Sequence, residues 1–511
     1  MHLLRRHAFP ILAILALVVA ACSGDTDDPV ADAVSQPTGG AVDQGLGSTD
    51  STEPDVLDLT AGSEPSTMAE LEASWAGNRS AVVDRLREGG YGVTDERLSG
   101  PGDFVVDLSR CPAGRGGDVA TTGPIEIVHI VSTADAGAYA DGARAYFDHV
   151  NSQGGIDGRR IDYEVVDDEL VPTKTIEAVD DRVDGNAIGI TTFGTATSQS
   201  VFDQLNRACI PQPFVGSAHP AWGDPRTHPW TLGLQLSYAT ETIHWGNWIK
   251  RNLTAQLPIK VAALAIDNDY GRAYRAAFEQ WASTNGDVVS DVVVVEHDPS
   301  ATELSAELTE IRAADPDVFL AMTAGSGCGA AVDAGEAAGV NEITDARFLP
   351  TACTDPQRFL IPNERDGDGY LAVDGGVKAA DDPLYESDPF VTFVNGLIAD
   401  TDVAPEQAAL AAAGAGQFAW AYVEALRIAA ELDGGVTRAN FLLALRSLEL
   451  RHPMVVAGIT FATDGADDGH PIEGARMMRY SAGQQAWEKE SLVVDLNRAT
   501  PNCSWDGTVC S

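Results

Sequence analysis

Residues 150–168, VNSQGGIDGRRIDYEVVDD, join a predicted helix directly to a predicted strand. Apolar and small residues recur at helical spacing over 138–150, and Asn151 with Gly154 and Gly155 supplies a stop for that helix. Residues 161–166 then alternate as a strand does. A helix that feeds straight into a strand is typical of a sheet covered by helices, although this stretch alone also fits an ordinary α/β turn.

The alternation of strand and helix patterns continues along the chain from Ile125. We expect strands at 125–131, 161–166, 187–191, 213–215, 259–265, 288–295, 318–322 and 347–349. We expect helices at 138–150, 174–183, 198–207, 238–252, 273–285, 301–314, 329–339, 406–432 and 436–448. This order predicts an α/β fold built on parallel sheets. The series is too long for one sheet with short loops, so it predicts two doubly wound lobes.

Several turns in this series resemble one known family. The string N-x-x-G-G-I-x-G-R at 151–159 is similar to the turn between helix and strand in periplasmic solute-binding proteins of the branched-chain amino-acid (Leu/Ile/Val) type. The resemblance covers roughly residues 120 to 485. It implies the type I periplasmic binding protein fold, in which a hinge of three crossings joins two lobes. It also implies an ABC-transporter partner, a small-molecule solute and no cofactor.

The first 22 residues have the pattern of a secretory signal. Arg5 and Arg6 precede an apolar run, and small residues lead to Cys22. This ending is typical of a bacterial lipobox, with Cys22 as the lipid-bearing first residue of the mature protein; a plain signal peptide cut near Ala21 is the alternative. No later run is apolar for long enough to span a bilayer. We therefore expect an extracytoplasmic protein, lipid-anchored to the outer face of the bacterial membrane.

Composition and the resemblance together divide the chain. A segment rich in Asp, Gly, Ser, Thr and Pro follows Cys22, which is typical of a disordered tether. A helical pattern at 68–88 and a short strand pattern at 104–108 form an extension before the α/β series. The expected parts are the signal (1–22), the tether (23–66), the extension (67–118), lobe one (119–235 and 373–452), lobe two (236–372 and 453–490) and a cysteine-bearing tail (491–511).

Seven cysteines become six after Cys22 is set aside. In an exported protein six cysteines predict three disulfides, for which fifteen connectivities exist. We favour Cys503 with Cys510 as a local loop and Cys328 with Cys353 across neighbouring strand ends, which leaves Cys111 with Cys209. No CxxC pair or HExxH helix occurs, so we expect no metal site.

The balance of charge excludes some partners. The chain has 33 Lys and Arg residues against 76 Asp and Glu residues, a net charge of −43. Such a surface disfavours nucleic acid and anionic headgroups, and it keeps a protein soluble and monomeric.

Candidate ligand residues follow the strands of lobe one, because ligands bind beyond the carboxyl ends of parallel strands. Phe193, Gly194 and Thr195 follow the third strand and open a helix, which resembles the family turn that holds a ligand carboxylate. The alternative is helix capping by Thr197 or Ser198. Ser217, Ala218 and His219 follow the next strand, where the family often has threonine or serine in place of His219. A surface histidine is the alternative there.

Lobe two offers a second group of candidates. Asp267-Asn268-Asp269-Tyr270-Gly271 is similar to the family turn D-x-x-Y-G, whose tyrosine packs on the ligand; a core aromatic is the alternative. Gly325 and Ser326 lie in a turn that also fits G-x-G-x-x-A, the pattern of a dinucleotide-binding enzyme. The next strand ends in Pro350-Thr351-Ala352, without the acid that would bind a ribose, which disfavours that class. Thr351 is the last candidate.

The ligand itself does not follow from the resemblance. Amino-acid binders commonly have an acid after the 347–349 strand, whereas this chain has Thr351 to Thr354 and reaches Asp355 later. We also interpret residues 132–139 as a loop that is short for the family. There is no G-x-S-x-G elbow and no nucleophile with a convincing partner, so we expect no enzyme. The sequence predicts the solute-binding component of an ABC importer, with a ligand-sensing receptor domain or an exported α/β enzyme as alternatives.

Overall fold

The computed structural model describes residues 65–112, 123–362, 365, 367–507 and 509–510. The predicted signal and Cys22 lie outside these residues, as does all of the predicted tether except Pro65 and Ser66. Within the described ranges no helix is both long and apolar enough to cross a membrane.

The first sheet contains three parallel strands in the order β5 (Ile161–Val166), β4 (Ile125–Ile130) and β6 (Gly189–Thr192). A parallel bridge from Phe193 to Gly216 extends it toward the parallel pair β7 (Gln212–Val215) and β8 (Thr231–Gly233). Ile127 of β4 shares an apolar cluster with α2 (Thr133–Ser152), whereas its neighbour Val128 shares one with α3 (Pro172–Asp180) and α4 (Thr195–Arg207). Helices therefore cover both faces of this sheet.

The second sheet has seven strands. Their order is β10 (Val289–His297), β9 (Ile259–Ile266), β11 (Val318–Met322), β12 (Ala346–Phe348), β13 (Leu371–Val373), β16 (Met477–Ser481) and β17 (Ala486–Lys489). Neighbours are parallel from β10 to β13, and β16 and β17 add antiparallel pairs. The near-continuous apolar run of β9 suits a strand that is buried on both faces.

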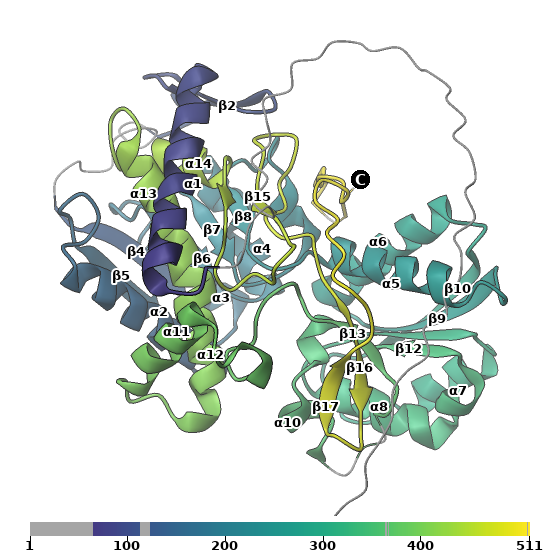
Figure 1. Ribbon diagram of the computed structural model, residues 1–511. Coiled ribbons are helices and arrows are strands. Elements are labelled where there is room, and N and C mark those ends of the chain that lie inside the picture. Colours follow the sequence, from purple (N-terminus) through teal and green to yellow (C-terminus); the bar gives the residue numbers. More distant parts are fainter. Residues whose placement is uncertain (1–64, 113–122, 363–364, 366, 508, 511) are drawn as a thin grey trace, which may run out of the picture. The chain divides into compact units, whose positions relative to one another are not determined.

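Helices also cover both faces of the second sheet (Figure 1). α5 (Tyr238–Asn252) and α6 (Asp269–Thr284) lie on one face, and α7 (Ser305–Ala313) and α8 (Ser326–Ala338) lie on the other. The short helices α9 (Val340–Ile343) and α10 (Pro356–Phe359) follow α8 along the chain. The α/β architecture with parallel sheets is as predicted, while the antiparallel pairs at one edge were not predicted.

After β13 the chain returns to the first sheet. α11 (Pro389–Ala399), α12 (Ala408–Ala413), a π-helical turn η7 (Gly414–Ala419) and α13 (Trp420–Glu431) form one run, in which α12 and η7 pack against α2. α14 (Arg438–Leu445) and the paired strands β14 (Glu449–Leu450) and β15 (Phe461–Ala462) follow. The chain thus passes between the two sheet systems after β8, after β13 and after β15.

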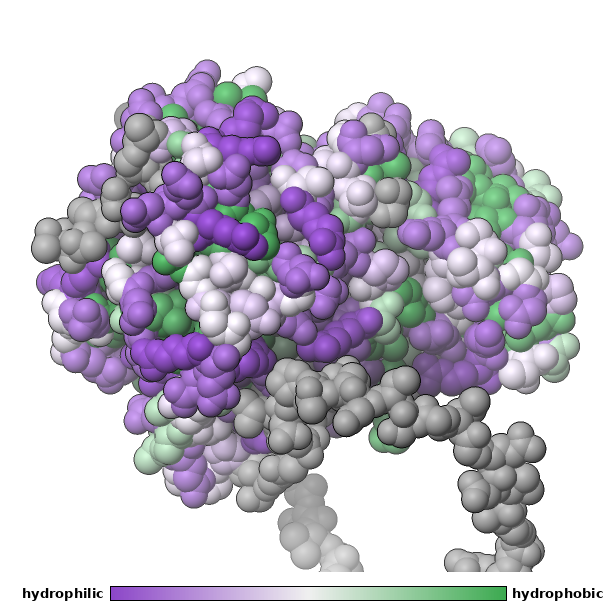
Figure 2. Space-filling view, turned by 90° about the horizontal axis from the view of Figure 1, so that it is seen from above, coloured by the Kyte–Doolittle hydropathy of each residue, from purple (hydrophilic) through white to green (hydrophobic). Residues whose placement is uncertain are grey.

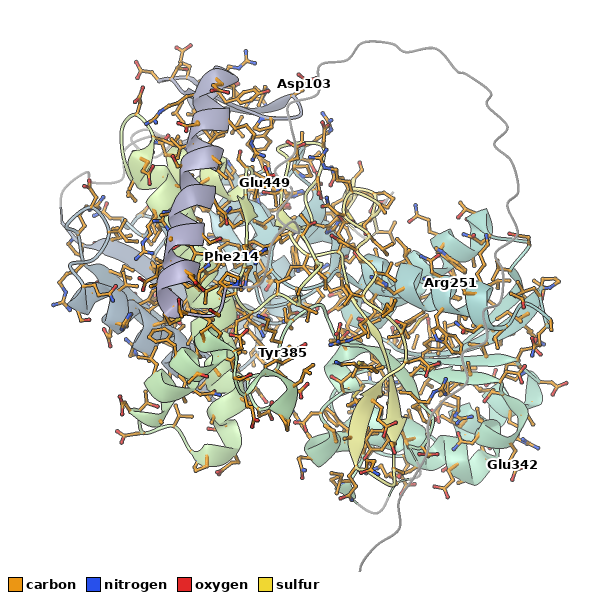
Figure 3. The ribbon with its side chains drawn as sticks, viewed as in Figure 1. Asp103, Phe214, Arg251, Glu342, Tyr385 and Glu449 are labelled. Atoms are coloured by element: carbon orange, nitrogen blue, oxygen red, sulfur yellow. A yellow bond between two sulfur atoms is a disulfide. The ribbon has the colours of Figure 1, made fainter. Side chains whose placement is uncertain are left out.

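The extension before β4 is part of the folded core. α1 (Met68–Glu88) buries Leu71, Trp75 and Val82 on one face, and a sheet of β1 (Gly92–Val93), β2 (Arg97–Gly100) and β3 (Phe104–Asp107) follows. Arg79 of α1 forms a 2.6 Å ion pair with the fully buried Glu424 of α13. Arg85, also on α1, forms an ion pair with Glu449 of β14, which is labelled in Figure 3. The extension therefore supports the helices that cover the first sheet.

One expectation about a loop was wrong. Residues 132–139 are not a loop, because α2 begins at Thr133, directly after β4. Ser132 is extended and donates a hydrogen bond to Asp135 across the first turn (2.7 Å). The helical pattern is hidden there by small residues, and Ala136 interrupts the helix with φ −134°.

The three predicted disulfides are present. Cys111 pairs with Cys209, which ties the extension to the turn before β7. Cys328 of α8 pairs with Cys353 after β12, and Cys503 pairs with Cys510 in the tail. Hydrophilic residues cover much of the face seen in Figure 2.

Candidate functional site

The turn after β6 presents polar groups at the carboxyl end of the first sheet. Gly194 has φ +89°, which favours glycine, and it immediately precedes α4. Gly216 lies so close to the Phe193 ring that an added Cβ would come within 2.4 Å of it. The main-chain amides of Thr195 and Ala196 have no acceptor among the described residues. Such amides at a helix N-terminus bind anionic or polar oxygen atoms.

Neither alternative capping residue caps α4. Thr197 Oγ1 donates to the main-chain carbonyl of Phe193, and Ser198 Oγ accepts a hydrogen bond from Thr192 Oγ1 (2.8 Å). No side chain caps this helix. The first amides of α4 therefore stay available to a ligand.

The turn after β7 lies next to this helix start. Ser217 Oγ is 2.9 Å from Thr195 Oγ1, and the hydroxyl of Tyr238 lies 3.3 Å from the same Thr195 atom. Ala218 is buried, and its carbonyl accepts a hydrogen bond from the amide of Tyr238 (2.9 Å). Three hydroxyl groups from three parts of the chain thus converge.

His219 is a buried residue, not the surface histidine of the alternative interpretation, and it is only 3% exposed. Its Nδ1 accepts a hydrogen bond from the Ala221 amide (3.1 Å), so the neutral ring carries its proton on Nε2. Nε2 lies 3.2 Å from the Gln199 side-chain amide. Burial lowers the pKa of His219 to about 4, so the ring is uncharged at neutral pH.

Three tyrosines from the second sheet system pack against one another. The ring centroids of Tyr238 and Tyr270 are 4.8 Å apart, and Tyr274 lies 4.3 Å from Tyr238 and 5.0 Å from Tyr270. The Tyr270 hydroxyl is buried and has no hydrogen-bond partner within the described part of the chain. An unpaired buried hydroxyl beside a group of converging hydroxyls is where a polar ligand atom would be stabilised most.

A buried carboxyl group lies behind these rings. Glu241 of α5 is 1% exposed and accepts hydrogen bonds from the Tyr274 hydroxyl (2.7 Å) and from the amide and hydroxyl of Thr351 (2.8 Å each). Burial raises the pKa of Glu241 to about 7, although these hydrogen bonds favour the ionised form. We shall call Thr195, Ser217, His219, Tyr238, Glu241, Tyr270, Tyr274 and Thr351 the strand-end cluster.

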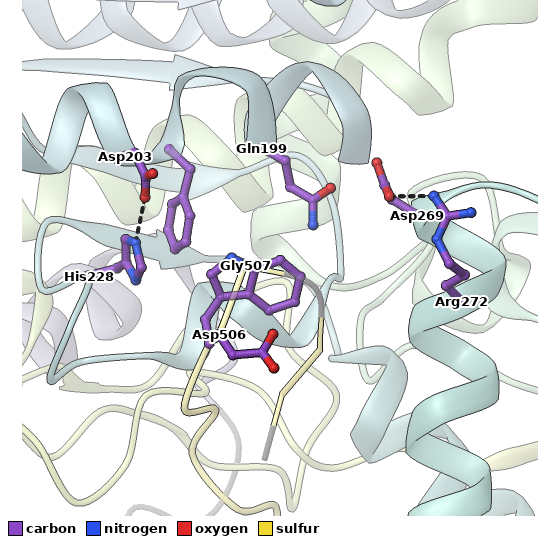
Figure 4. Close-up of a pocket in the computed structure, with 9 residues that line it drawn as sticks. Gln199, Asp203, His228, Asp269, Arg272, Asp506 and Gly507 are labelled. Carbon is purple, nitrogen blue, oxygen red and sulfur yellow. Dashed lines mark hydrogen bonds and ion pairs between the residues drawn. The ribbon is translucent and has the colours of Figure 1, made fainter.

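A pocket of about 510 Å³ opens beside the strand-end cluster (Figure 4). Gln199 and Trp505 line it, and both also contact His219, the indole of Trp505 with its centroid 5.2 Å from the imidazole. The remaining lining residues are Phe202, Asp203, His228, Asp269, Arg272, Asp506 and Gly507. The pocket is therefore bounded by α4, by α6 and by the C-terminal tail.

The sequence matches the model of the periplasmic binding protein family over residues 131–485, more than half of the chain. The chain belongs to this family. Its fold is the type I periplasmic binding protein fold, and proteins of this family are extracytoplasmic. No curated protein has a significant match to the sequence.

Solved structures share the fold at low sequence identity. A fatty acid ABC transporter substrate-binding protein from Thermomonospora curvata is 14% identical, with a TM-score of 0.62, over 77% of this chain and 97% of that one. A branched-chain amino acid ABC transporter protein from Thermus thermophilus with bound valine is 15% identical, with a TM-score of 0.60, over 73% and 97%. A possible leucine/isoleucine/valine-binding protein from Rhodopirellula baltica is 13% identical, with a TM-score of 0.57, over 73% and 98%.

Two of the predicted site residues lie apart from the cluster of this periplasmic binding protein. Gly325 and Ser326 are exposed at the start of α8, and no hydrogen bond among the described residues joins Ser326 to the cluster. Thr351 does reach the cluster, but its polar groups are engaged by Glu241. Phe193 lies at the edge, 6.1 Å from Tyr139 between ring centroids.

Sequence reasoning missed Tyr238, Glu241, Tyr274 and Trp505. A signal for Glu241 was present, because it follows Tyr238 by three residues and precedes Trp245 by four. That spacing places an acid on the buried aromatic face of a helix. An acidic side chain is rarely buried in this way unless it has a partner. Trp505 had no such signal, because only the folded tail brings it beside His219.

This geometry indicates no metal site within the described residues. No group of three His, Cys, Asp or Glu side chains in the described ranges is arranged to hold a metal ion. Gly325 and Gly327 fit the dinucleotide pattern at the start of α8, but the residues that follow the next strand, β12, run from Leu349 to Thr351 and include no acid. Glu241 reaches this turn from α5, but it is hydrogen-bonded to Thr351 and buried.

Proposed function

We propose that this protein is the solute-binding component of an ABC importer, held on the outer face of the membrane by a lipid on Cys22. It binds a small polar or amphipathic, amino-acid-like solute between its two sheet systems and presents the closed form to permease subunits. The family match and the extracytoplasmic class support this assignment. The observation that carries it is the contact between Thr195 and Tyr238, because it joins the two systems at their strand ends.

Each system contributes a different kind of group to the solute. Thr195, Ser217 and the free amides of α4 suit a carboxylate or another polar oxygen. The tyrosines suit apolar and aromatic atoms, and the unpaired Tyr270 hydroxyl can meet a polar one. Binding that uses both systems favours the closed conformation, which is the state a transporter can distinguish.

The same geometry disfavours an enzyme. Ser217 Oγ accepts a hydrogen bond from the His219 main-chain amide (3.3 Å), but the His219 Nδ1 already accepts one from the Ala221 amide and its Nε2 faces Gln199. Neither ring nitrogen can take a proton from Ser217, which a serine nucleophile requires.

A thermal-shift screen of amino acids, amides, short-chain acids and aromatic acids would identify a solute, and small-angle scattering would then measure compaction. Tyr270→Ala should weaken binding by roughly 1 to 3 kcal/mol and reduce compaction more than Thr195→Ala does at matched saturation. Tyr270→Phe keeps the ring and removes only the unpaired hydroxyl, so it separates packing from hydrogen bonding. A bound solute that causes no compaction in the unaltered protein would contradict the proposed function.

A further inference from the structure

The C-terminal tail lies outside the residues that match the family, yet it contributes three of the nine residues that line the pocket. β17 ends in the second sheet at Lys489, and the chain then passes back to the first sheet system. There the Cys503 amide donates to the Gly223 carbonyl (2.9 Å) and the Trp505 amide donates to Asp224 (3.2 Å). This is a fourth passage between the two systems.

Apolar packing, a disulfide and a hydrogen bond hold the tail in place along the pocket. Cys503 packs in an apolar cluster with Phe202, Val215 and Trp222, and its disulfide to Cys510 closes the loop that contains Trp505. Thr240 of α5 also lies 2.8 Å from Thr500 through their hydroxyls. Trp505 is thus held beside His219 by contacts on both sides of its loop.

The pocket is rich in carboxylates and has few cations. Its lining includes Asp203, Asp269 and Asp506, against one arginine and one histidine. Arg272 is already engaged by two carboxylates, Asp269 at 2.7 Å and Asp267 at 3.0 Å.

The histidine of the lining offers no free positive charge either. His228 lies between Asp203 (2.9 Å) and Asp224 (3.2 Å), as Figure 4 shows for the first of these. An anionic solute group would have to compete with these carboxylates. A positively charged group would be attracted by them.

The nearby strand-end cluster has the same imbalance. Glu241 forms no ion pair with a basic residue within the described part of the chain, and its three hydrogen-bond donors are uncharged. The indole of Trp505, which lines the pocket, adds an aromatic surface on which an ammonium group and its hydrocarbon chain can both pack.

We propose that the disulfide-closed tail is one wall of the solute pocket, and that this pocket takes the positively charged amino group of an organic cation. This inference rests on the proposed function and specifies its solute class. The Trp505 ring contacts the ammonium group, Asp506 and the Asp269 carboxylate that also pairs with Arg272 attract it, and the remainder of the solute extends past Gln199 toward His219 and Thr195.

The test uses the mature full-length protein and probes matched in shape but opposite in charge. Tyramine and phenethylamine are compared with 3-(4-hydroxyphenyl)propionate and 3-phenylpropionate by calorimetry and thermal shift. We expect the amines to bind and to raise the melting temperature, the acids to do neither, and added salt to weaken amine binding.

Substitutions then locate the binding. Trp505→Leu should weaken amine binding about fivefold, while Trp505→Phe should retain most of it. Asp269→Asn and Asp506→Asn should each weaken it about threefold. The control Asp162→Asn removes an exposed carboxylate on β5, outside the pocket lining, and it should change nothing. Melting temperatures without ligand show whether each variant is folded.

Three results would overturn the inference: no amine binds, the acids bind as well as the amines, or amine binding is unaffected by both the Trp505→Leu and the Asp506→Asn substitutions.

Different results would contradict the proposed function. If an acidic or neutral solute binds and compacts the protein, the transport assignment stands and only the solute class is wrong. If a solute binds without compaction, the transport assignment is wrong.

Discussion

Glu241 accepts hydrogen bonds from both the main-chain amide and the hydroxyl of Thr351, each at 2.8 Å. The sequence has no acid directly after β12, and the carboxyl group at this position comes instead from α5. The two residues belong to segments that lie far apart in the chain. Their contact fixes the turn after β12 against the helix that also carries Tyr238.

Replacing Glu241 by glutamine should change how stability depends on pH. Burial raises the pKa of this carboxyl from its ordinary value of 4.5 to about 7 in the folded protein, so the folded state holds the proton more tightly. Stability from this group is full below about pH 4.5 and is lost as the pH rises through about 7. The unaltered protein should therefore lose up to roughly 3 kcal/mol relative to Glu241→Gln between these limits.

Urea unfolding at several pH values measures this difference. Glutamine imitates the protonated acid, since its amide can donate to the Thr351 and Tyr274 hydroxyls. Glu310→Gln, at an exposed position on α7, is the matched control and should keep the pH dependence of the unaltered protein. Parallel curves for Glu241→Gln and the unaltered protein would show that the buried carboxyl is not the titrating group.

A disulfide should stabilise the fold more when it closes a longer loop. The bond from Cys111 to Cys209 spans 98 residues and the bond from Cys503 to Cys510 spans 7. In the chain-entropy model these lengths correspond to about 5 and about 2 kcal/mol. Paired serine substitutions, compared by urea unfolding, should follow that order.

Thiol titration of the denatured, unreduced mature protein should find almost no free thiol, and two or more free thiols would contradict the three disulfides.

The parts of the fold that follow from local periodicity could be predicted from the sequence. α5 lies at the predicted residues, and the β9 strand differs by one residue, because each has a long, uninterrupted pattern. The start of α2 was missed because small residues at its first turns conceal the period. The antiparallel strands β16 and β17 were missed because pairing at a sheet edge depends on partners from distant segments.

The candidate site was only partly predictable for a similar reason. Thr195, Ser217 and Tyr270 follow strands directly, so the rule for the carboxyl ends of strands finds them. Tyr238 and Trp505 reach the same place from a helix start and from the tail, and nothing in their neighbours indicates it. Ser326 satisfies the strand-end rule but lies exposed on α8, which shows that the rule selects an edge of a sheet and not a site.

The predicted anchor can be tested on the unprocessed chain. Cys22→Ala removes the thiol that would receive the lipid, so the protein should be released from the membrane or mislocalised. Fractionation of cells measures this, with Ser48→Ala in the predicted tether as the control that should stay on the membrane. Firm membrane attachment of the Cys22→Ala protein would show that something other than this lipid holds it.

The packing of α2 against α12 and the η7 turn depends on two glycines. An added Cβ at Gly142 would lie 1.8 Å from the carbonyl oxygen of Ala411, and one at Gly414 would lie 1.8 Å from that of Tyr139. Both helices are therefore in main-chain contact. Gly142→Ala should force them apart and lower the free energy of unfolding by about 1 to 3 kcal/mol, despite the better helix propensity of alanine.

Gly137 of the same helix gives the matched control. A Cβ there would meet only Thr133 Cβ at 3.7 Å, an ordinary contact. Gly137→Ala should thus be neutral or should stabilise the protein by up to about 1 kcal/mol. Urea unfolding compares the two variants directly, and equal stabilities would mean that α2 and α12 are not in main-chain contact. Because α2 also carries Tyr139 at the edge of the site, a loss of solute affinity in Gly142→Ala alone would connect this packing to binding.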